Sequence, residues 1–164
     1  MEDHRMDAPA GWQKINDHEL VVTVHNFLLK SAFPDEDFEA VPILAEGAFV
    51  ILAVTLVEAE YFNGGLEQAL GNPSGAMVPN AMRGYRILGL TAKADVLMRA
   101  IEFAGLDLFP SAHAPRDQAI KAVADAPEWD ELNQAFEDEK DEEGPELETL
   151  QAQYIRAHPE EFFR

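Results

Sequence analysis

The chain has 164 residues, of which 47% are apolar, and a formal net charge of −19 from 31 acidic and 12 basic residues. This apolar content is enough for one folded domain with a substantial core, and it argues against intrinsic disorder despite the charge. The absence of cysteine excludes disulfides, thiolate metal sites and cysteine nucleophiles. Because nucleic acids and anionic membranes bind proteins that supply cations, we expect no direct binding to either, and we expect basic proteins as partners.

The N-terminus lacks a basic segment followed by an apolar stretch, so the sequence predicts no signal peptide. The longest apolar run, residues 48–57, is too short to cross a bilayer and predicts a buried helix instead. Together with the absence of cysteine, these features predict a cytoplasmic protein.

Residues 1–15 are polar and without a pattern, and we expect them to form a loose N-terminal arm that Trp12 and Ile15 hold against the body. From residue 16 onward, apolar residues recur at the three- and four-residue spacing that predicts amphipathic helices. The predicted helical segments are residues 17–33, a long helix from after Pro42 to Phe62, and then 66–70, 78–88, 91–103, 116–124, 129–142 and 145–157.

Turn and capping residues separate these segments. Asn63-Gly64-Gly65 predicts a helix stop, Thr91 an N-cap, and Pro145 the first turn of the last helix. No segment alternates apolar and polar residues as a half-buried strand would. The sequence therefore predicts an all-α fold, organised as a single compact multi-helix domain over residues 1–164 with short turns.

Residues 125–148 form an acidic helical segment with a net charge of −11, in which Lys140 is the one cation. A helix with a carboxylate at every second residue shows about one charge per ~3 Å, roughly half the density of duplex DNA. Apolar residues interleave with the acids at helical spacing and predict that the segment packs on the core: Trp129, Leu132, Phe136, Leu147, Leu150 and Tyr154. From charge alone, a solvated helix face or a frayed tail is the alternative.

No nucleophile elbow, P-loop or dinucleotide-binding motif occurs, so we expect no catalytic residue and no cofactor. Ser74 lies in a turn between helices, where a serine usually bonds its own backbone. Glu58, Glu60 and Glu67 could form an acid/base pair, but Glu58 and Glu60 point to different sides of a helix. For Glu67 we expect hydrogen bonds to backbone donors of the turn, and a structural role for all three carboxylates.

The five histidines, His4, His18, His25, His113 and His158, are scattered along the chain. None follows a glutamate by three residues, and the H-E-x-x-H motif is missing. His18 and His25 share one helix face but have no third ligand nearby in the sequence. The sequence therefore predicts no metal site.

The stretch from Val57 to Gly75 resembles the central motif of a bacterial DNA-mimic protein family. In that motif a glutamate-bearing helix meets Asn-Gly-Gly, an aromatic-rich turn with Gln, Asn-x-x-Gly and then a helix of small residues. Ala69 and Leu70 depart from the aromatic pair expected there. The resemblance covers roughly residues 40–105, and the matching residues are Asn63, Gly64, Gly65, Gln68, Asn72, Ser74 and Gly75.

The resemblance implies an all-helical and often dimeric protein without an established enzymatic activity. The function it implies is to present carboxylates in a DNA-like arrangement to the DNA-binding face of a transcription factor. The motif itself looks architectural, because mimicry depends on where surface acids lie.

Our leading hypothesis is therefore a non-enzymatic DNA mimic that binds a basic transcription factor or nucleoid protein. The mimic itself can be a homodimer. The predicted partner-binding residues are Asp35, Glu36, Asp37, Asp130, Glu137, Asp138, Glu139, Asp141, Glu142 and Glu143. The alternative is an immunity or antitoxin-like protein that neutralises a basic toxin enzyme such as a nuclease. An enzyme acting through Glu58, Glu60 or Glu67, and a domain whose acidity serves only solubility, are the remaining hypotheses.

Overall fold

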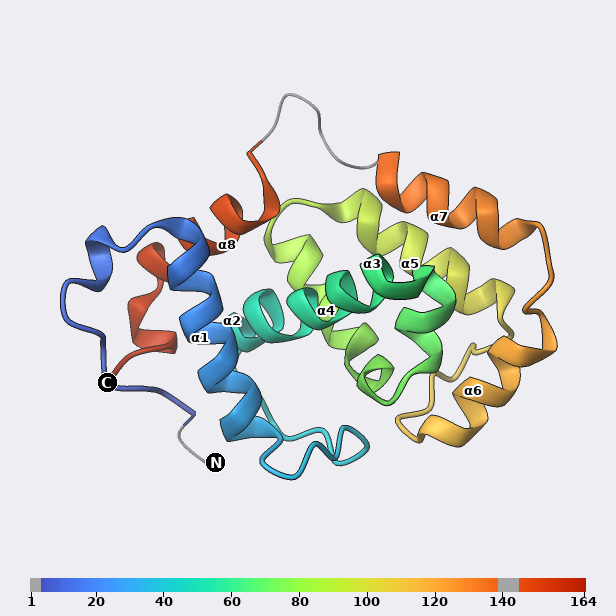
Figure 1. Cartoon of the computed structure of the whole chain (residues 1–164), viewed down its shortest axis with the longest axis horizontal. Coiled ribbons are helices and arrows are strands. Elements are labelled where there is room, and N and C mark those ends of the chain that lie inside the picture. Colours follow the sequence, from blue (N-terminus) through green and yellow to red (C-terminus); the bar gives the residue numbers. More distant parts are fainter. Residues whose placement is uncertain (1–3, 139–144) are drawn as a thin grey trace.

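The computed structural model describes residues 4–138 and 145–164, and these residues form helices without a β-strand (Figure 1). This confirms the predicted all-α fold. Most helices are joined by short turns as predicted, but residues 33–45 and 104–112 are longer loops. The helices are α1 (Asp17–Ala32), α2 (Glu46–Ala48), α3 (Val54–Gly71), α4 (Val78–Ile87), α5 (Thr91–Phe103), α6 (His113–Ala122), α7 (Glu128–Asp138) and α8 (Leu147–Ala157). Short 3₁₀ turns add Trp12–Lys14, Pro73–Met77 and Pro159–Glu161.

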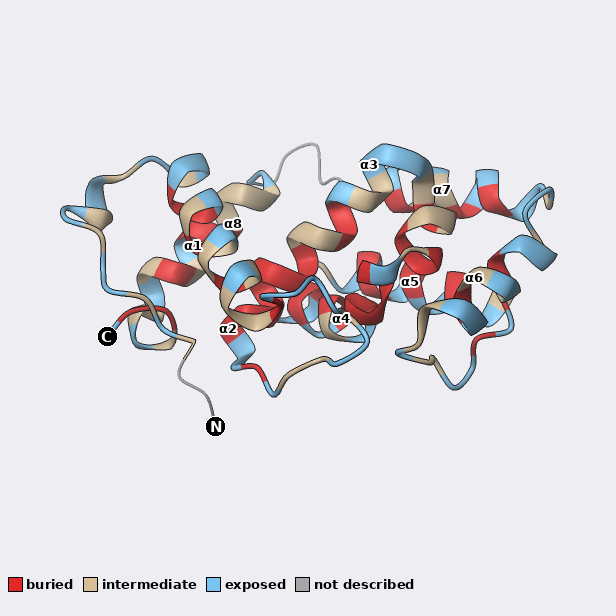
Figure 2. Ribbon diagram, turned by 60° about the horizontal axis from the view of Figure 1, so that its bottom comes forward, coloured by how far each residue is buried: buried red, intermediate tan, exposed pale blue. Residues whose placement is uncertain are grey.

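One long helix, the core helix, crosses the middle of the molecule and is kinked at Gly64 and Gly65 (Figure 1). It consists of α2, a π-helical stretch Phe49–Ala53 and α3, and its residues 48–54 are all buried (Figure 2). The core helix, Glu46–Gly71, is much longer than the apolar run that predicted it. By length and composition it could cross a membrane. Half of its most apolar stretch is buried inside the structure, as in the core helix of a folded domain.

Polar side chains from two neighbouring helices support the π-helical stretch. A π-helical turn displaces backbone carbonyls from their usual partners, and buried carbonyls need donors. Gln151 of α8 is 1% exposed and donates from Nε2 to Val50 O at 2.8 Å. Burial lowers the pKa of His25 on α1, while a hydrogen bond to the Ile51 backbone opposes that shift. The helices α1 and α8 therefore supply hydrogen-bond donors to the core helix in addition to apolar contacts.

The predicted helix stop at Asn63-Gly64-Gly65 is a kink after which the helix resumes. Gly65 has φ +75°, a left-handed conformation that favours glycine, and Gly64 is extended. The chain then continues as helix from Leu66 to Gly71. The break is confirmed, but the element ends further along the chain than Phe62.

Two predicted helix starts are wrong by one or two residues. Thr91 is the first residue of α5, and the N-cap position belongs to Leu90. Pro145 does not lie in the first turn of α8, because that helix begins at Leu147 with Glu146 as its N-cap residue. Neither N-cap side chain bonds the helix backbone, so packing rather than capping chemistry sets these starts.

Helix α6 begins at His113, three residues before the predicted start at Arg116. The extra turn has a partner that is far away in the sequence, since the Glu39 carboxylate accepts the His113 N–H at 2.7 Å. An anion at a helix N-terminus satisfies a free donor and complements the helix dipole. The same contact ties the segment between α1 and α2 to α6.

The first residues of the described chain pack on the last ones. Met6 N donates to Phe162 O at 2.9 Å, Arg164 N donates to Met6 O at 3.1 Å, and the rings of Trp12 and Phe163 lie 4.7 Å apart. Both chain ends therefore lie at the same end of the molecule, beside α1 and α8 (Figure 1).

Helix α4 approaches the core helix closely at Gly84. A Cβ atom added there would lie 2.5 Å from Phe49 O and 2.7 Å from Val54 Cγ2, which is too close for either helix to stay in place. We expect Gly84→Ala to lower the free energy of unfolding by about 1–3 kcal/mol in urea denaturation. Gly71→Ala is the control, because its Cβ would meet only Ile120 at 3.7 Å or more, and we expect little change. Equal stabilities of the two variants would contradict the close packing.

Candidate functional site

Helix α7 carries its apolar and acidic residues on opposite faces. Trp129, Leu132 and Phe136 are 5% exposed or less, which confirms the predicted packing for α7, whereas Leu147, Leu150 and Tyr154 on α8 are only half-buried. At 3.6 residues per turn, the remaining positions point to the other side of the helix. The five acids of α7 are all exposed: Glu128, Asp130, Glu131, Glu137 and Asp138. They span about 15 Å of helix axis, over which duplex DNA carries about nine charges.

Asn133 fixes α7 to the kink in α3. Its Oδ1 accepts the Leu66 N–H at 2.8 Å, and its Nδ2 donates to Glu67 Oε2 at 2.9 Å. The Tyr61 hydroxyl donates to the Asn133 backbone carbonyl at 3.0 Å. The prediction that Glu67 bonds the backbone donors of the turn is wrong, because Asn133 takes the Leu66 donor and Glu67 holds Asn133. The residues at the glycine kink thus hold α7 in place through hydrogen bonds to Asn133.

A buried ion pair lies beneath α7. Lys93 Nζ is 2.5 Å from Glu58 Oε1, and the Tyr85 hydroxyl donates to the same oxygen at 2.6 Å. The Lys93 ammonium also lies 4.1 Å from the ring centroid of Phe136, a cation–π contact that reaches into α7. Burial, the charge of Glu58 and its hydrogen bond raise the pKa of Tyr85. These contacts support a structural role for Glu58.

The Glu60 carboxylate accepts hydrogen bonds from three polar side chains of the motif. Its Oε2 accepts from Gln68 Nε2 and Asn72 Nδ2, both at 2.8 Å, and its Oε1 accepts from Ser74 Oγ at 2.7 Å. Glu58 and Glu60 bind different partners, so the structure does not join them in an acid/base pair. The three donors hold the turn after α3 against the helix before the kink, which is an architectural role.

The ionisation of Glu60 should make stability depend on pH. Burial raises its pKa, but the hydrogen bonds from Ser74, Gln68 and Asn72 outweigh burial, so the pKa lies below the ordinary value of 4.5. A group whose pKa is lowered by folding stabilises the protein above its unfolded-state pKa and loses that effect as pH falls through the folded-state pKa. We expect Glu60→Gln to cost about 1–2 kcal/mol at neutral pH.

Below about pH 4.5, the wild type should lose stability more steeply than Glu60→Gln. Urea denaturation of both proteins from neutral pH down to about pH 3 measures this difference. Parallel pH profiles would show that the Glu60 carboxylate contributes nothing through its charge.

Arg116 is fully buried and explains the last glycine of the motif. Its guanidinium donates to the backbone carbonyls of Leu70 and Asn72, both at 2.9 Å, and of Pro73 at 3.1 Å. A Cβ at Gly75 would clash with Arg116 Nη1 and lie 2.6 Å from Leu70 O, so only glycine leaves room for this arginine. The matched motif therefore builds the fold around the turn rather than a reactive centre.

The predicted partner-binding residues fall into two separate places. Asp35, Glu36 and Asp37 are exposed in the segment between α1 and α2, where the Asp37 carboxylate accepts the Glu39 N–H at 3.0 Å. Asp130, Glu137 and Asp138 lie on α7, at the opposite edge of the molecule in both ribbon views (Figures 1 and 2). The structure does not bring these two groups together. The remaining predicted residues, Glu139, Asp141, Glu142 and Glu143, lie outside the described residues.

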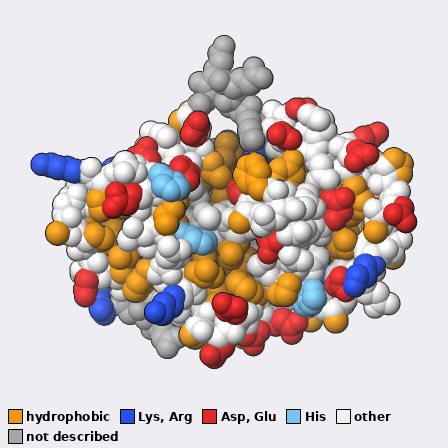
Figure 3. All heavy atoms as spheres, in the orientation of Figure 1, with side chains coloured by type: hydrophobic (Ala, Val, Ile, Leu, Met, Phe, Trp, Pro, Cys, Tyr) orange, Lys and Arg blue, Asp and Glu red, His pale blue; other side chains and the backbone are white. Residues whose placement is uncertain are grey.

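An exposed aromatic residue stands beside the acidic face of α7. Phe62 is 66% exposed, and its ring contacts Tyr61 edge-on at 5.8 Å. Burial raises the pKa of Tyr61, and the charges of Glu137, Glu58, Asp138 and Glu67 raise it further, so two acids of α7 act on Tyr61. Sequence reasoning missed Phe62, although its place just before the glycine kink was a usable signal. Carboxylates also outnumber lysine and arginine on the visible surface at this end of the molecule (Figure 3).

The histidines contact acids in two places. His18 Nδ1 lies 2.9 Å from Glu148 Oε1, which links α1 to α8. His158 Nδ1 lies 3.9 Å from both Glu160 Oε1 and Glu161 Oε1. Sequence reasoning missed this second group because it searched for glutamate three residues before histidine, whereas here the acids follow.

The family model described as DMP19-like protein, for DNA mimic protein 19, matches residues 44–158. No protein with a curated description matches significantly, and no solved structure does. The matched region begins just before the core helix and includes the kink, the motif around Glu60 and α7. Since the match spans more than half of the sequence, the chain belongs to the DMP19-like protein family.

Proposed function

We propose that the protein is a non-enzymatic DNA mimic whose α7 face occupies the cationic DNA-binding surface of a transcription factor or nucleoid protein. The observation that carries this proposal is the docking of α7. Three buried apolar residues and Asn133 hold the helix in place, and its five carboxylates are exposed. Membership in the DMP19-like family supports the same reading.

Binding would be competitive with DNA and driven by charge. Opposite charges steer the two proteins together, so association is fast at low salt and slows as salt rises. Lysine and arginine on the partner would pair with the carboxylates, and arginine would make bidentate contacts. Because α7 is already held by the core, less ordering entropy is lost on binding than a flexible acidic tail would lose.

Phe62 would supply an apolar contact within this charged surface. Exposed aromatic residues that become buried at an interface often carry much of the binding energy. A protein partner can cover the exposed Phe62 ring, which lies next to Tyr61. Such a contact favours a specific protein interface over acidity that serves only solubility.

The other predicted residues enter the proposal in two ways. Glu139, Asp141, Glu142 and Glu143 follow α7 in the sequence and lie outside the described residues, and we propose them as further partner contacts from their charge alone. Asp35, Glu36 and Asp37 lie at the opposite edge (Figures 1 and 2), so they form a surface separate from the one that contacts the partner. In a homodimer in the cytoplasm, two α7 faces would be available to a dimeric DNA-binding protein.

Affinity capture tests the proposed function. The full chain is immobilised and exposed to a lysate of its host at low salt, and bound proteins are eluted with duplex DNA or with rising salt. We expect a DNA-binding protein that both treatments release. A toxin enzyme that resists salt would support the immunity reading instead. Retention equal to that of an unrelated protein of the same acidity would contradict both.

A further inference from the structure

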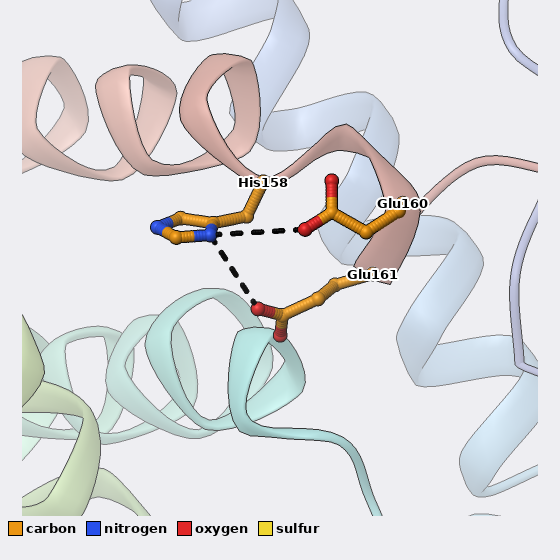
Figure 4. A group of neighbouring side chains, drawn as sticks. All are labelled: His158, Glu160 and Glu161. Atoms are coloured by element: carbon orange, nitrogen blue, oxygen red, sulfur yellow. Dashed lines mark ion pairs between the residues drawn. The ribbon is translucent and has the colours of Figure 1, made fainter.

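The C-terminal segment after α8 gathers three side chains that are able to coordinate a metal ion. In Figure 4 the His158 ring turns Nδ1 toward the Glu160 and Glu161 carboxylates, at 3.9 Å from an oxygen of each. One ligand atom from each residue lies within 4.8 Å of the other two. Some point therefore lies within about 2.8 Å of all three atoms, so small side-chain shifts would reach the ~2.0–2.2 Å of Zn–N and Zn–O bonds.

The surrounding contacts hold two of these groups in place. The Tyr154 ring lies 4.5 Å from the His158 ring at 33°, and the Tyr154 hydroxyl donates to Glu161 Oε1 at 3.0 Å. Glu161 Oε2 accepts the N–H of Gly47 at 2.6 Å. Partners of this kind orient metal ligands and raise metal affinity. The side chains therefore need small movements, not a rearrangement, to close on a cation.

The local charge also favours a cation. The Glu160 and Glu161 carboxylates each place an oxygen 3.9 Å from His158 Nδ1. Two carboxylates thus concentrate negative potential beside one histidine. A bound divalent cation would offset their mutual repulsion.

We propose that His158, Glu160 and Glu161 form a binding site for one divalent transition-metal ion, with Zn²⁺ as the fitting probe. One imidazole nitrogen and two carboxylate oxygens suit Zn²⁺, and water would complete the coordination. Mg²⁺ and Ca²⁺ take oxygen ligands and fit this set less well. This site is independent of the acidic face of α7.

A cation here would fasten the C-terminal segment to the core. Glu161 bonds Gly47 in the first turn of the core helix, and His158 ends α8. A ligand that binds the folded state alone raises the unfolding temperature as its concentration increases. Zn²⁺ should therefore raise the melting temperature of the full chain, and Mg²⁺ at the same concentration should raise it much less.

Calorimetric titration of the full chain with ZnCl₂, together with the melting temperature, tests the site. We expect one saturable Zn²⁺ site, weakened by at least about tenfold in His158→Ala and in Glu160→Gln. Glu160 is exposed, so Glu160→Gln should keep the fold. His18→Ala is the matched control, because His18 also contacts a glutamate but only one, and the Zn²⁺ affinity of this variant should be unchanged.

The matched variants are needed because a chain with 31 acids also binds divalent cations loosely. Zn²⁺ binding that is equal in the wild type, His158→Ala and Glu160→Gln would overturn the proposal. So would the absence of saturable binding at millimolar Zn²⁺. Either result would mean that the three side chains form an ion pair only.

Discussion

Reversing the charges of Glu137 and Asp138 with lysine is expected to weaken binding to a DNA-binding partner by at least about tenfold at physiological salt. Two attractive contacts would become repulsive, and a loss of about 1.4 kcal/mol in binding free energy is enough to weaken the affinity tenfold. Both residues lie in the last described turn of α7, where cations suit the helix dipole better than anions do. The variant should therefore keep its fold, and circular dichroism and the melting temperature check this.

Asp35→Lys combined with Glu36→Lys is the matched control, because it changes the net charge by the same amount at the opposite edge of the molecule. Only the general reduction in acidity should act on its binding, and that effect should be small at physiological salt. Affinities are measured for both variants at several salt concentrations. If the two variants lose affinity equally, binding follows net charge and α7 is not the interface.

Replacing Lys93 with methionine is expected to lower the free energy of unfolding by about 3–5 kcal/mol at neutral pH. The change leaves Glu58 buried without its cation and removes the cation–π contact with Phe136. Methionine has nearly the length of lysine, so the loss of packing is small. Urea denaturation measures the difference.

The double variant Lys93→Met/Glu58→Gln separates charge from packing. The neutral amide oxygen introduced by Glu58→Gln can still accept the Tyr85 hydroxyl, so this variant should be more stable than Lys93→Met alone. A loss below about 1 kcal/mol in the single variant would show that water reaches the pair and that burial does not strengthen it.

Much of the helix pattern could be predicted from the sequence, because it depends on local rules. The glycines at the kink and the interleaved apolar residues of α7 carry their own conformational and hydrophobic signals. Contacts over long sequence distances could not be predicted. Asn133 beneath the kink and Glu39 at the start of α6 are ordinary polar residues in the sequence, and only the fold gives them their partners.

For the acidic surface, too, local features could be predicted from the sequence and long-range positions could not. Spacing alone predicted that α7 has one apolar and one acidic face. The distance between α7 and Asp35, Glu36 and Asp37 depends on how the helices stack, so the sequence offered no reason to separate the two groups. Ala69 and Leu70, which replace the expected aromatic pair, are buried in the core.

The most direct test of DNA mimicry is whether DNA and this protein exclude one another on the captured partner. The partner is labelled, bound to the wild-type chain, and titrated with duplex DNA while the complex is followed by fluorescence anisotropy. Mimicry through α7 predicts full displacement, with an apparent dissociation constant for the chain that rises linearly with DNA concentration. A ternary complex in which the partner holds DNA and this protein at once would contradict it.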